Sequence, residues 1–415
     1  MNSDTHFLDG GVASPQGFQS FSARAGLKTS GDDIVLVISD SPATSAGVFT
    51  QNRVKAAPVL LCAEHLQNET ARAIVANAGN ANCCTGEQGM SDTRAMCEIV
   101  AREIGCAAHE ILVCSTGIIG HALPMEKLAP ALQSLARKST PENGRTFETN
   151  EAAARAFMTT DTRPKFFAAQ AKFDGKIVTI GGQAKGAGMI APEMAALNGS
   201  DLHATMLCFL TTDARIEKSL LQSALEKSVE RSLNSTTIDG DTSTNDSCLI
   251  LANGASGVEI TEENFVPFCA LLESVCVALA KEIARDGEGA TKLVTVEIAG
   301  AKNEADAKSI AMTVANSPLV KTAIFGRDPN WGRICAAAGR AGIAFDAAKL
   351  GVQIGAVEVF REGEPTAFSL ADAEAAMSEN ELTIRVTLGE GNAKWTAWTC
   401  DFSYDYVKIN AEYHT

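Results

Sequence analysis

The sequence predicts an α+β or layered α/β fold, and three observations support that prediction. Short apolar runs of strand type alternate with amphipathic helical stretches along almost the whole chain. Residues 294–298 and 382–386 alternate apolar and polar side chains with period two, as half-buried strands do. The strands and helices follow one another in mixed order, which favours layers of sheet and helix over a simple doubly wound sheet.

The spacing of apolar residues places the individual elements. Helices are expected where apolar side chains recur three to four positions apart, at residues 91–104, 216–232 and 265–284. Strands are expected at further short apolar runs, at residues 34–38, 73–76, 111–114, 176–180 and 206–210. No low-complexity linker and no short repeat interrupts this pattern.

Length and composition indicate a globular protein. The chain has 415 residues, long for one domain and comfortable for two, and 46% of them are hydrophobic and 20% charged. Its net charge of −15 lacks the basic excess typical of nucleic-acid binding. No apolar run reaches the ~18 residues of a membrane span, and no basic stretch followed by an apolar run marks a secretory signal.

Cysteine and histidine usage argues against a metal site. The twelve cysteines are scattered without a C-x-x-C motif, and the six histidines are isolated without H-E-x-x-H. Zinc-binding and thioredoxin-like readings therefore lose their main support, and no metal is predicted. Buried, reduced thiols are typical of the cytoplasm, where this protein is expected to reside.

Five segments combine small and polar residues in ways that a hydrophobic core does not require. They are STGIIG, KGAGMIAP, IDGDTSTND, DGEGATK and FGRDPNWGR, at residues 115–120, 185–192, 238–246, 286–292 and 325–333. IDGDTSTND carries three acids but does not match the calcium-loop pattern of an EF-hand. FGRDPNWGR adds Trp331 between polar turns.

Three of these segments offer groups suited to catalysis or binding. The Thr116 hydroxyl and the N–H of Gly117 can point at one oxygen, as an oxyanion hole requires, although an ordinary capped turn explains the same residues. Lys185 can pair with a carboxylate; a surface turn is the alternative, and no phosphate-loop pattern is matched. Glu288 can hold an ammonium group, or it belongs to a solvated turn.

Thr205 precedes an apolar run, where a threonine is usually a plain strand residue. No Ser-His-Asp or Cys-His set is readable, so a nucleophile here needs another base. A threonine at a new N-terminus supplies its own base, because an α-amine has a pKa of about 7.7–8. The small Ala204 would leave the preceding bond accessible, but these residues alone do not select Thr205.

Taken in order, the segments resemble one family, the ornithine acetyltransferases (glutamate N-acetyltransferases) of the cyclic arginine pathway. The likeness covers nearly the whole chain. Its motifs are AGVFT (46–50), NAGNAN (77–82), STG (115–117), MTTDT (158–162), KGAGMI (185–190), ATML (204–207), DGDTSTND (239–246), DGEGATK (286–292), DPNWGR (328–333) and DYVKINA (405–411). Each motif is weak by itself, but their common order leaves little room for chance.

The resemblance implies roles for individual residues. Thr205 matches the nucleophile, released by self-cleavage of the Ala204–Thr205 bond into a first chain of residues 1–204 and a second of residues 205–415. Thr116 and Gly117 match the oxyanion hole. The matching substrate-binding positions are Thr159 or Thr160, between which the sequence does not decide, with Lys185, Thr205, Glu288, Asn410 and Thr415.

The resemblance also implies a fold, an assembly and a reaction. The fold is an αββα-type sandwich with β-sheets between helices, and the assembly is a heterotetramer of two first and two second chains. The reaction carries an acetyl group from N-acetylornithine to glutamate through an acetyl-Thr205 intermediate. No cofactor is implied, and acetyl-CoA stays open as a second acetyl donor because family members differ on this point.

One departure from the family pattern concerns cleavage. Residues 196–204 are inserted before Thr205, and Glu193 replaces the usual asparagine, so self-cleavage can be slowed or prevented. Two alternatives therefore stay open: a self-cleaving aminopeptidase with an N-terminal Ser or Thr, and an unprocessed non-catalytic homologue. The Lys185 loop and the segment 410–415 favour the transferase.

Overall fold

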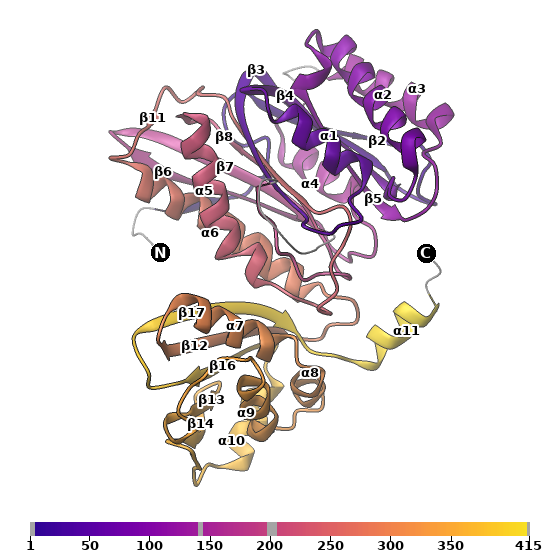
Figure 1. The fold of residues 1–415 in the computed structure, drawn as a ribbon. Helices are drawn as coiled ribbons and strands as arrows, with labels where there is room; N and C mark the ends of the chain where they lie inside the picture. The colour runs from indigo at the N-terminus through magenta and orange to yellow at the C-terminus, as the bar shows by residue number, and fades with distance from the viewer. Residues whose placement is uncertain (1–4, 140–143, 197–205, 413–415) are drawn as a thin grey trace. The chain divides into compact units, whose positions relative to one another are not determined.

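The computed structural model describes residues 5–139, 144–196 and 206–412, and the chain divides into two compact units (Figure 1). The first unit comprises residues 1–234 and 241–279, and the second comprises residues 235–240 and 280–414. These units do not coincide with the predicted cleavage products, because much of the predicted second chain lies within the first unit.

A sheet of nine strands forms the centre of the first unit. The strands are β1 (His6–Leu8), β2 (Phe18–Ala23), β3 (Ile34–Phe49), β4 (Thr70–Asn80), β5 (Ile111–Ile118), β6 (Lys165–Phe173), β7 (Lys176–Lys185), β8 (Leu207–Thr212) and β10 (Ser247–Ala252). Their order is β1-β6-β7-β8-β10-β3-β4-β5, with β2 paired to β3. Most neighbours are antiparallel, whereas β8–β10 and β4–β5 are parallel. Two short strands, β9 (Arg215–Ile216) and β11 (Glu259–Ile260), pair separately.

Helices pack on both faces of this sheet. They are α1 (Ala57–His65), α2 (Gly86–Ile104), α3 (Met125–Lys138), α4 (Phe147–Ala156), α5 (Lys218–Glu230) and α6 (Phe265–Arg285). Phe209 of β8 stacks on Phe157 at the end of α4, with ring centroids 5.2 Å apart. The next residue, Leu210, points to the opposite face, where Gly182 meets Val275 and Leu279 of α6. Alternation along one strand thus buries apolar side chains under both helix layers.

The second unit is built on a sheet of six strands in the order β15-β14-β13-β16-β12-β17. The strands are β12 (Leu293–Ala301), β13 (Gly351–Ile354), β14 (Val357–Arg361), β15 (Glu364–Pro365), β16 (Glu381–Thr387) and β17 (Ala393–Cys400). The helices are α7 (Glu304–Ala315), α8 (Pro318–Phe325), α9 (Trp331–Gly339), α10 (Leu370–Ser378) and α11 (Tyr404–Glu412). Helix α7 packs on β12 and β17.

The mixed sheets and their helices confirm the predicted α+β class, and every predicted helix and strand is present with shifted ends. The largest difference is β3, which continues to Phe49 instead of ending at Ile38. Asp40 and Pro42 suggest a turn, but the register against β4 shifts between Ile38 and Ala43. A β-bulge therefore bends the strand and lets it continue past a proline.

Strand pairing predicts that the two chains expected from cleavage stay together. Strands β8 and β10 follow Thr205 in the sequence, whereas their neighbours β7 and β3 precede it. Six residue pairs join β7 to β8, and six join β10 to β3. We expect protein cut before Thr205 to elute as one species in native size-exclusion chromatography and to give two bands on a denaturing gel. Separation of the chains without denaturant would contradict this pairing.

Candidate active site

Thr116 and Gly117 are consecutive residues of β5, the last strand in the sheet order. Thr116 is only 1% exposed. At Gly117, φ is 133°, and a Cβ would lie 2.3 Å from the carbonyl carbon of Gly79 and 2.5 Å from the nitrogen of Asn80. A side chain here would collide with the backbone of β4, so the close approach of the two strands requires glycine. The predicted oxyanion pair therefore lies within a strand, not in a turn after it.

Buried polar contacts hold this part of β5 in place. Asn245 Nδ2 donates to the carbonyl oxygens of Ser115, at 2.9 Å, and Ala81, at 2.6 Å. Ser115 Oγ in turn donates to Asn77 Oδ1 at 2.7 Å. A buried network with its donors and acceptors paired is rigid, so the residue after Ser115 is presented in a defined position.

Lys185 links two other predicted residues. It is the last residue of β7 and is 2% exposed. Its Nζ donates to Thr159 Oγ1 at 2.9 Å and to Thr116 Oγ1 at 3.3 Å. Because the ammonium group uses an acceptor position of Thr116, the hydroxyl hydrogen can still be donated to another oxygen. Of the threonines 159 and 160, Thr159 is the one for which the structure shows this contact.

Asp161 is an ionised carboxylate that supports this cluster. Its Oδ1 accepts from Lys165 Nζ at 2.6 Å and from the Gly186 nitrogen at 2.7 Å, and its Oδ2 accepts from the Thr159 nitrogen at 3.1 Å. Burial alone would raise the pKa of Asp161, but the charges of Lys165 and Lys185 and the hydrogen bonds outweigh it and hold the pKa well below its usual range. Asp161 thus ties the Thr159 turn to the loop after Lys185.

Lys28 fixes the chain just before the Thr159 turn. Its Nζ donates to the carbonyl oxygens of Ala156, at 2.9 Å, and Met158, at 3.2 Å. The loop of Lys28 is itself held by Asp33, whose Oδ2 accepts from the Lys28 nitrogen at 3.1 Å. Burial lowers the pKa of Lys28, although Asp33 and other nearby carboxylates oppose the shift.

Glu288 and Asn410, two predicted substrate-binding residues, meet in the second unit. Asn410 Nδ2, on α11, donates to Glu288 Oε2 at 2.9 Å across 122 positions of sequence. At Gly289, φ is 69°, and a Cβ would lie 2.5 Å from the nitrogen of Tyr406. The turn that carries Glu288 therefore packs directly on the backbone of α11 and holds the pair together.

The predicted nucleophile Thr205, its neighbour Ala204 and the predicted binding residue Thr415 lie outside the described residues, and their roles stay predictions. Met206 is the first described residue after position 205, and its carbonyl oxygen accepts from the Ser247 nitrogen at 2.9 Å. Leu207 then pairs in register with Lys185. The chain therefore enters β8 beside Lys185, two residues after position 205.

The segment 325–333 has a packing role. Trp331 stacks on Phe360 with ring centroids 4.9 Å apart. The side chain of Asn330 accepts from the Arg333 nitrogen at 3.3 Å and caps α9. These contacts account for the tryptophan between polar turns without a substrate.

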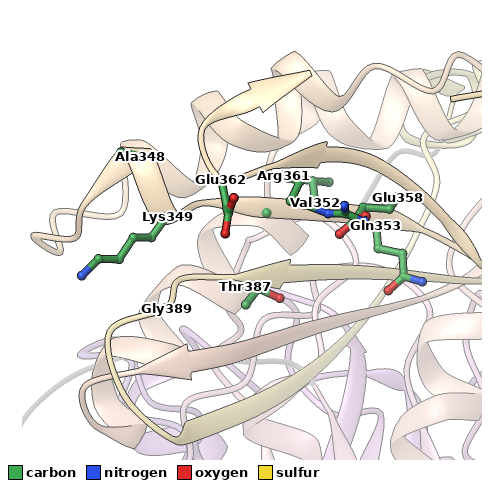
Figure 2. A pocket seen from close by; sticks show the side chains of 10 residues that line it. Ala348, Lys349, Val352, Gln353, Glu358, Arg361, Glu362, Thr387 and Gly389 are labelled. Atoms are coloured by element: carbon green, nitrogen blue, oxygen red, sulfur yellow. The ribbon is translucent and has the colours of Figure 1, made fainter. Parts of the chain in front are cut away.

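A hollow of about 590 Å³ lies in the second unit (Figure 2). Lys349 lies at the opposite end of this hollow from Gln353 and Glu358 (Figure 2). Three of the charged side chains that line the hollow are already paired, since Arg361 bonds Glu358 and Lys349 Nζ lies 3.5 Å from Glu390. None of the predicted site residues lines it, so it is not the candidate site.

The described residues show neither a metal-binding cluster nor a membrane-spanning helix. Over residues 5–139, 144–196 and 206–412, no three His, Cys, Asp or Glu side chains are grouped so as to hold a metal ion. Every helix of the same residues is too short or too polar to span a bilayer.

Sequence reasoning missed Asp161, Lys165 and Asn245 as parts of the site. Asp161 and Asn245 lie in the MTTDT and DGDTSTND motifs, but the motifs did not indicate which acid or amide faces inward. Lys165 belongs to no motif, and its spacing of four residues from Asp161 was the one available signal.

Comparison with known proteins supports one family. The ArgJ family model matches residues 19–415. The "Arginine biosynthesis bifunctional protein ArgJ" of Thermosynechococcus vestitus is 46% identical, covering 98% of this chain and 99% of its own, and that of Symbiobacterium thermophilum is 44% identical, covering 99% and 100%. The crystal structure of a Mycobacterium tuberculosis ornithine acetyltransferase complexed with ornithine is 41% identical over 46% of this chain and 100% of that chain, with a TM-score of 0.43.

The family match spans nearly the whole chain, as did the ordered motifs, and it confirms the resemblance that those motifs predicted. The two curated relatives are also matched over almost their full lengths. The chain belongs to the ArgJ family.

Proposed function

We propose that this chain transfers an acetyl group from N-acetylornithine to glutamate in arginine biosynthesis, through an acetyl ester on Thr205. The observation that carries the proposal is the cluster in which Lys185 bonds both Thr116 and Thr159. Membership of a family with relatives called arginine biosynthesis proteins supports it, as does a relative that binds ornithine. Cleavage of the Ala204–Thr205 bond would supply the free threonine.

The reaction proceeds in two steps, acetylation of Thr205 and transfer of the acetyl group to glutamate. The Thr205 hydroxyl oxygen attacks the acetyl carbonyl carbon, and the Thr205 α-amine takes the hydroxyl proton. The Thr116 hydroxyl and the Gly117 N–H stabilise the tetrahedral oxyanion, a contribution of about 3–4 kcal/mol per good donor. The C–N bond breaks, the proton passes to the leaving amine, and ornithine departs. The neutral amine of glutamate then attacks the ester carbonyl carbon and the C–O bond to Thr205 breaks. The proton that the amine loses passes through the Thr205 α-amine to the Thr205 oxygen, which restores the hydroxyl.

Charge in the site supports recognition of amino acids. Lys165 and Lys185 both act on Asp161, so this group of three side chains carries more positive than negative charge. We assign the α-carboxylate common to both substrates to Lys185 and Thr159. We assign a cationic substrate group to Glu288, which Asn410 contacts, and we keep Thr415 as a further proposed substrate-binding residue.

Product formation by the purified protein tests this function. With N-acetylornithine and glutamate as the only substrates, we expect equal amounts of ornithine and N-acetylglutamate, measured by chromatography. Hydrolysis of aminoacyl amides in place of transfer would favour the self-cleaving aminopeptidase. Absence of both activities, with a single uncut mass of 43.5 kDa, would favour the non-catalytic homologue.

The proposal includes no cofactor, and it includes acetyl-CoA as a second acetyl donor. The word bifunctional in the names of the relatives supports a second activity. An assay of CoA release with glutamate as acceptor tests it. We further propose an αββα sandwich cut into chains 1–204 and 205–415, assembled as a heterotetramer of two of each in the cytoplasm.

A further inference from the structure

Cys83 and Cys84 form a pair of neighbouring thiols in the loop between β4 and α2, and neither has an assigned role. Adjacent side chains of an extended chain point to opposite sides. At Cys84 the backbone instead turns, with φ at 59°, and the two Sγ atoms lie 3.8 Å apart. Cys83 is 0% exposed, whereas Cys84 is exposed. One thiol of the pair therefore meets solvent, and the buried second thiol is in contact with it.

The buried thiol is connected to the hydrogen bonds that position Thr116. Cys83 Sγ shares a hydrogen bond with the side chain of Thr244, and Thr244 Oγ1 donates to Asn245 Oδ1 at 2.6 Å. Because the Thr244 hydrogen goes to Asn245, the Cys83 thiol is the donor to the Thr244 oxygen. Asn245 Nδ2 donates in turn to the carbonyl oxygen of Ser115 at 2.9 Å. Side-chain contacts thus connect the Cys83 sulfur to the residue before Thr116.

The backbone of the pair is also joined to β5. The Gly120 nitrogen donates to the Cys83 carbonyl oxygen at 3.0 Å, and the Ala81 nitrogen donates to the Ile118 carbonyl oxygen at 2.9 Å. Gly117, the second predicted oxyanion donor, directly precedes Ile118 in the strand. A change in the backbone at Cys83 therefore acts on the end of the strand that carries the oxyanion pair.

We propose that Cys83 and Cys84 are an oxidation site for peroxides, at which Cys84 reacts first and Cys83 then closes a disulfide with it. The Cys84 sulfur attacks one oxygen of hydrogen peroxide, the O–O bond breaks, and the other oxygen leaves as water with the thiol proton. The Cys83 sulfur attacks the sulfur of the Cys84 sulfenic acid, the S–O bond breaks, and a second water leaves with the Cys83 proton. The two thiols lose two electrons, which reduce the peroxide to water.

Exposure sets the order of the two steps, and geometry makes them reversible. Burial raises the pKa of the Cys83 thiol, so it stays protonated while the exposed Cys84 meets the oxidant. The Cα atoms of adjacent residues lie about 3.8 Å apart, less than the roughly 4.4–6.8 Å that disulfides usually span. The disulfide is therefore strained, and a strained disulfide is easily reduced.

Closing this disulfide changes both connections to the oxyanion strand. The two sulfurs must approach from 3.8 Å to about 2.0 Å, which pulls on the backbone at Cys83. The Cys83 sulfur also loses its hydrogen, so it no longer donates to the Thr244 oxygen. We therefore expect the oxidised form to hold Thr116 and Gly117 less firmly and to transfer acetyl groups more slowly. This consequence, unlike the thiol chemistry, rests on the proposed function.

The thiol chemistry is tested on the full chain with hydrogen peroxide, followed by alkylation of the remaining thiols and digestion with trypsin. No Lys or Arg lies between Arg72 and Arg94, so the tryptic peptide 73–94 contains both cysteines of the pair and no others. It should carry two alkyl groups before oxidation, none after it, and two again after treatment with dithiothreitol. A peptide that keeps both alkyl groups at a peroxide concentration that oxidises any other thiol would overturn the proposal.

The effect on catalysis is tested with Cys84→Ser, which removes the exposed thiol and should form no disulfide. Oxidation should lower the kcat of the wild type by about 10²-fold, the lower end of the cost of losing one oxyanion donor. Cys84→Ser should keep its kcat at the same peroxide concentration. Cys106→Ser is the matched control, because Cys106 is a partly exposed cysteine of the same unit. It should lose activity with peroxide and regain it with dithiothreitol, as the wild type does.

Two results would overturn the connection between the thiol pair and the site. One is an unchanged kcat in protein whose peptide 73–94 is fully oxidised, and the other is equal inactivation of Cys84→Ser and the wild type. Absence of acetyl transfer from the reduced wild type would instead remove the proposed function. The peptide masses would still decide whether the two cysteines form the disulfide.

Discussion

Thr205→Ala is expected to leave a single chain of 43.5 kDa without acetyl transfer. Alanine has no hydroxyl group and cannot attack a carbonyl carbon. Neither cleavage of the peptide bond before position 205 nor attack on N-acetylornithine can therefore occur. Removing the nucleophile of a covalent mechanism lowers kcat on the order of 10⁶-fold in comparable enzymes. Intact mass and the ornithine release assay measure the two effects independently.

Thr205→Ser is the matched control for this substitution. Serine keeps the hydroxyl and, once the bond is cut, the α-amine, so both cleavage and transfer should persist at reduced rates. Normal turnover by Thr205→Ala would end the proposed mechanism. Loss of both activities in Thr205→Ser would point to a role for the threonine methyl group instead of its hydroxyl.

Gly117→Ala is expected to lower kcat by about 10²–10³-fold, as loss of one oxyanion donor does. The added Cβ would lie 2.3 Å from the carbonyl carbon of Gly79, a distance that the backbone must relieve by moving β5 away from β4. That movement displaces the N–H of residue 117 and the hydroxyl of Thr116 together. Overpacking of this kind also costs about 1–3 kcal/mol of stability, measurable as a lower thermal unfolding midpoint.

Gly120→Ala is the control that distinguishes the effect of the Cβ collision at Gly117 from the effect of placing alanine at a positive φ. Gly120 also has a positive φ, 87°, but nothing lies within 4 Å of the position of its Cβ. It should therefore show a modest loss of stability and nearly normal kcat. Equal losses of activity in the two variants would mean that the approach of β4 to β5 does not position the oxyanion hole.

Many elements of the fold could be predicted from the sequence because their signals are local. Period two in residues 294–298 and helical spacing in residues 91–104 report which face of a segment is buried, and both elements are present. The ends were less predictable. The bulge in β3 depends on pairing with β4, so Asp40 and Pro42 looked like the end of a strand.

The candidate site was predicted through the order of its motifs, not through any geometry readable in the chain. Thr116 and Lys185 are 69 residues apart, and no local pattern states that their side chains meet. The likeness to a family supplied that connection. It did not indicate that Asp161 would be the buried carboxylate that bonds the Thr159 and Gly186 nitrogens, or that the Asp246 side chain would be buried without a hydrogen-bond partner among the described residues.

The sequence by itself determined the family, the positions of most strands and helices, and the residue types available for acyl transfer, because these depend on local order and composition. Tertiary structure decided which of those residues meet. The contact of Lys185 with Thr116 and Thr159, the lowered pKa of Asp161 and the raised pKa of Asp246 all depend on burial and on neighbours that are distant in the sequence. Desolvation and charge interactions depend on which groups lie close together in space. The pKa shifts that they cause therefore arise only once the sheet has formed.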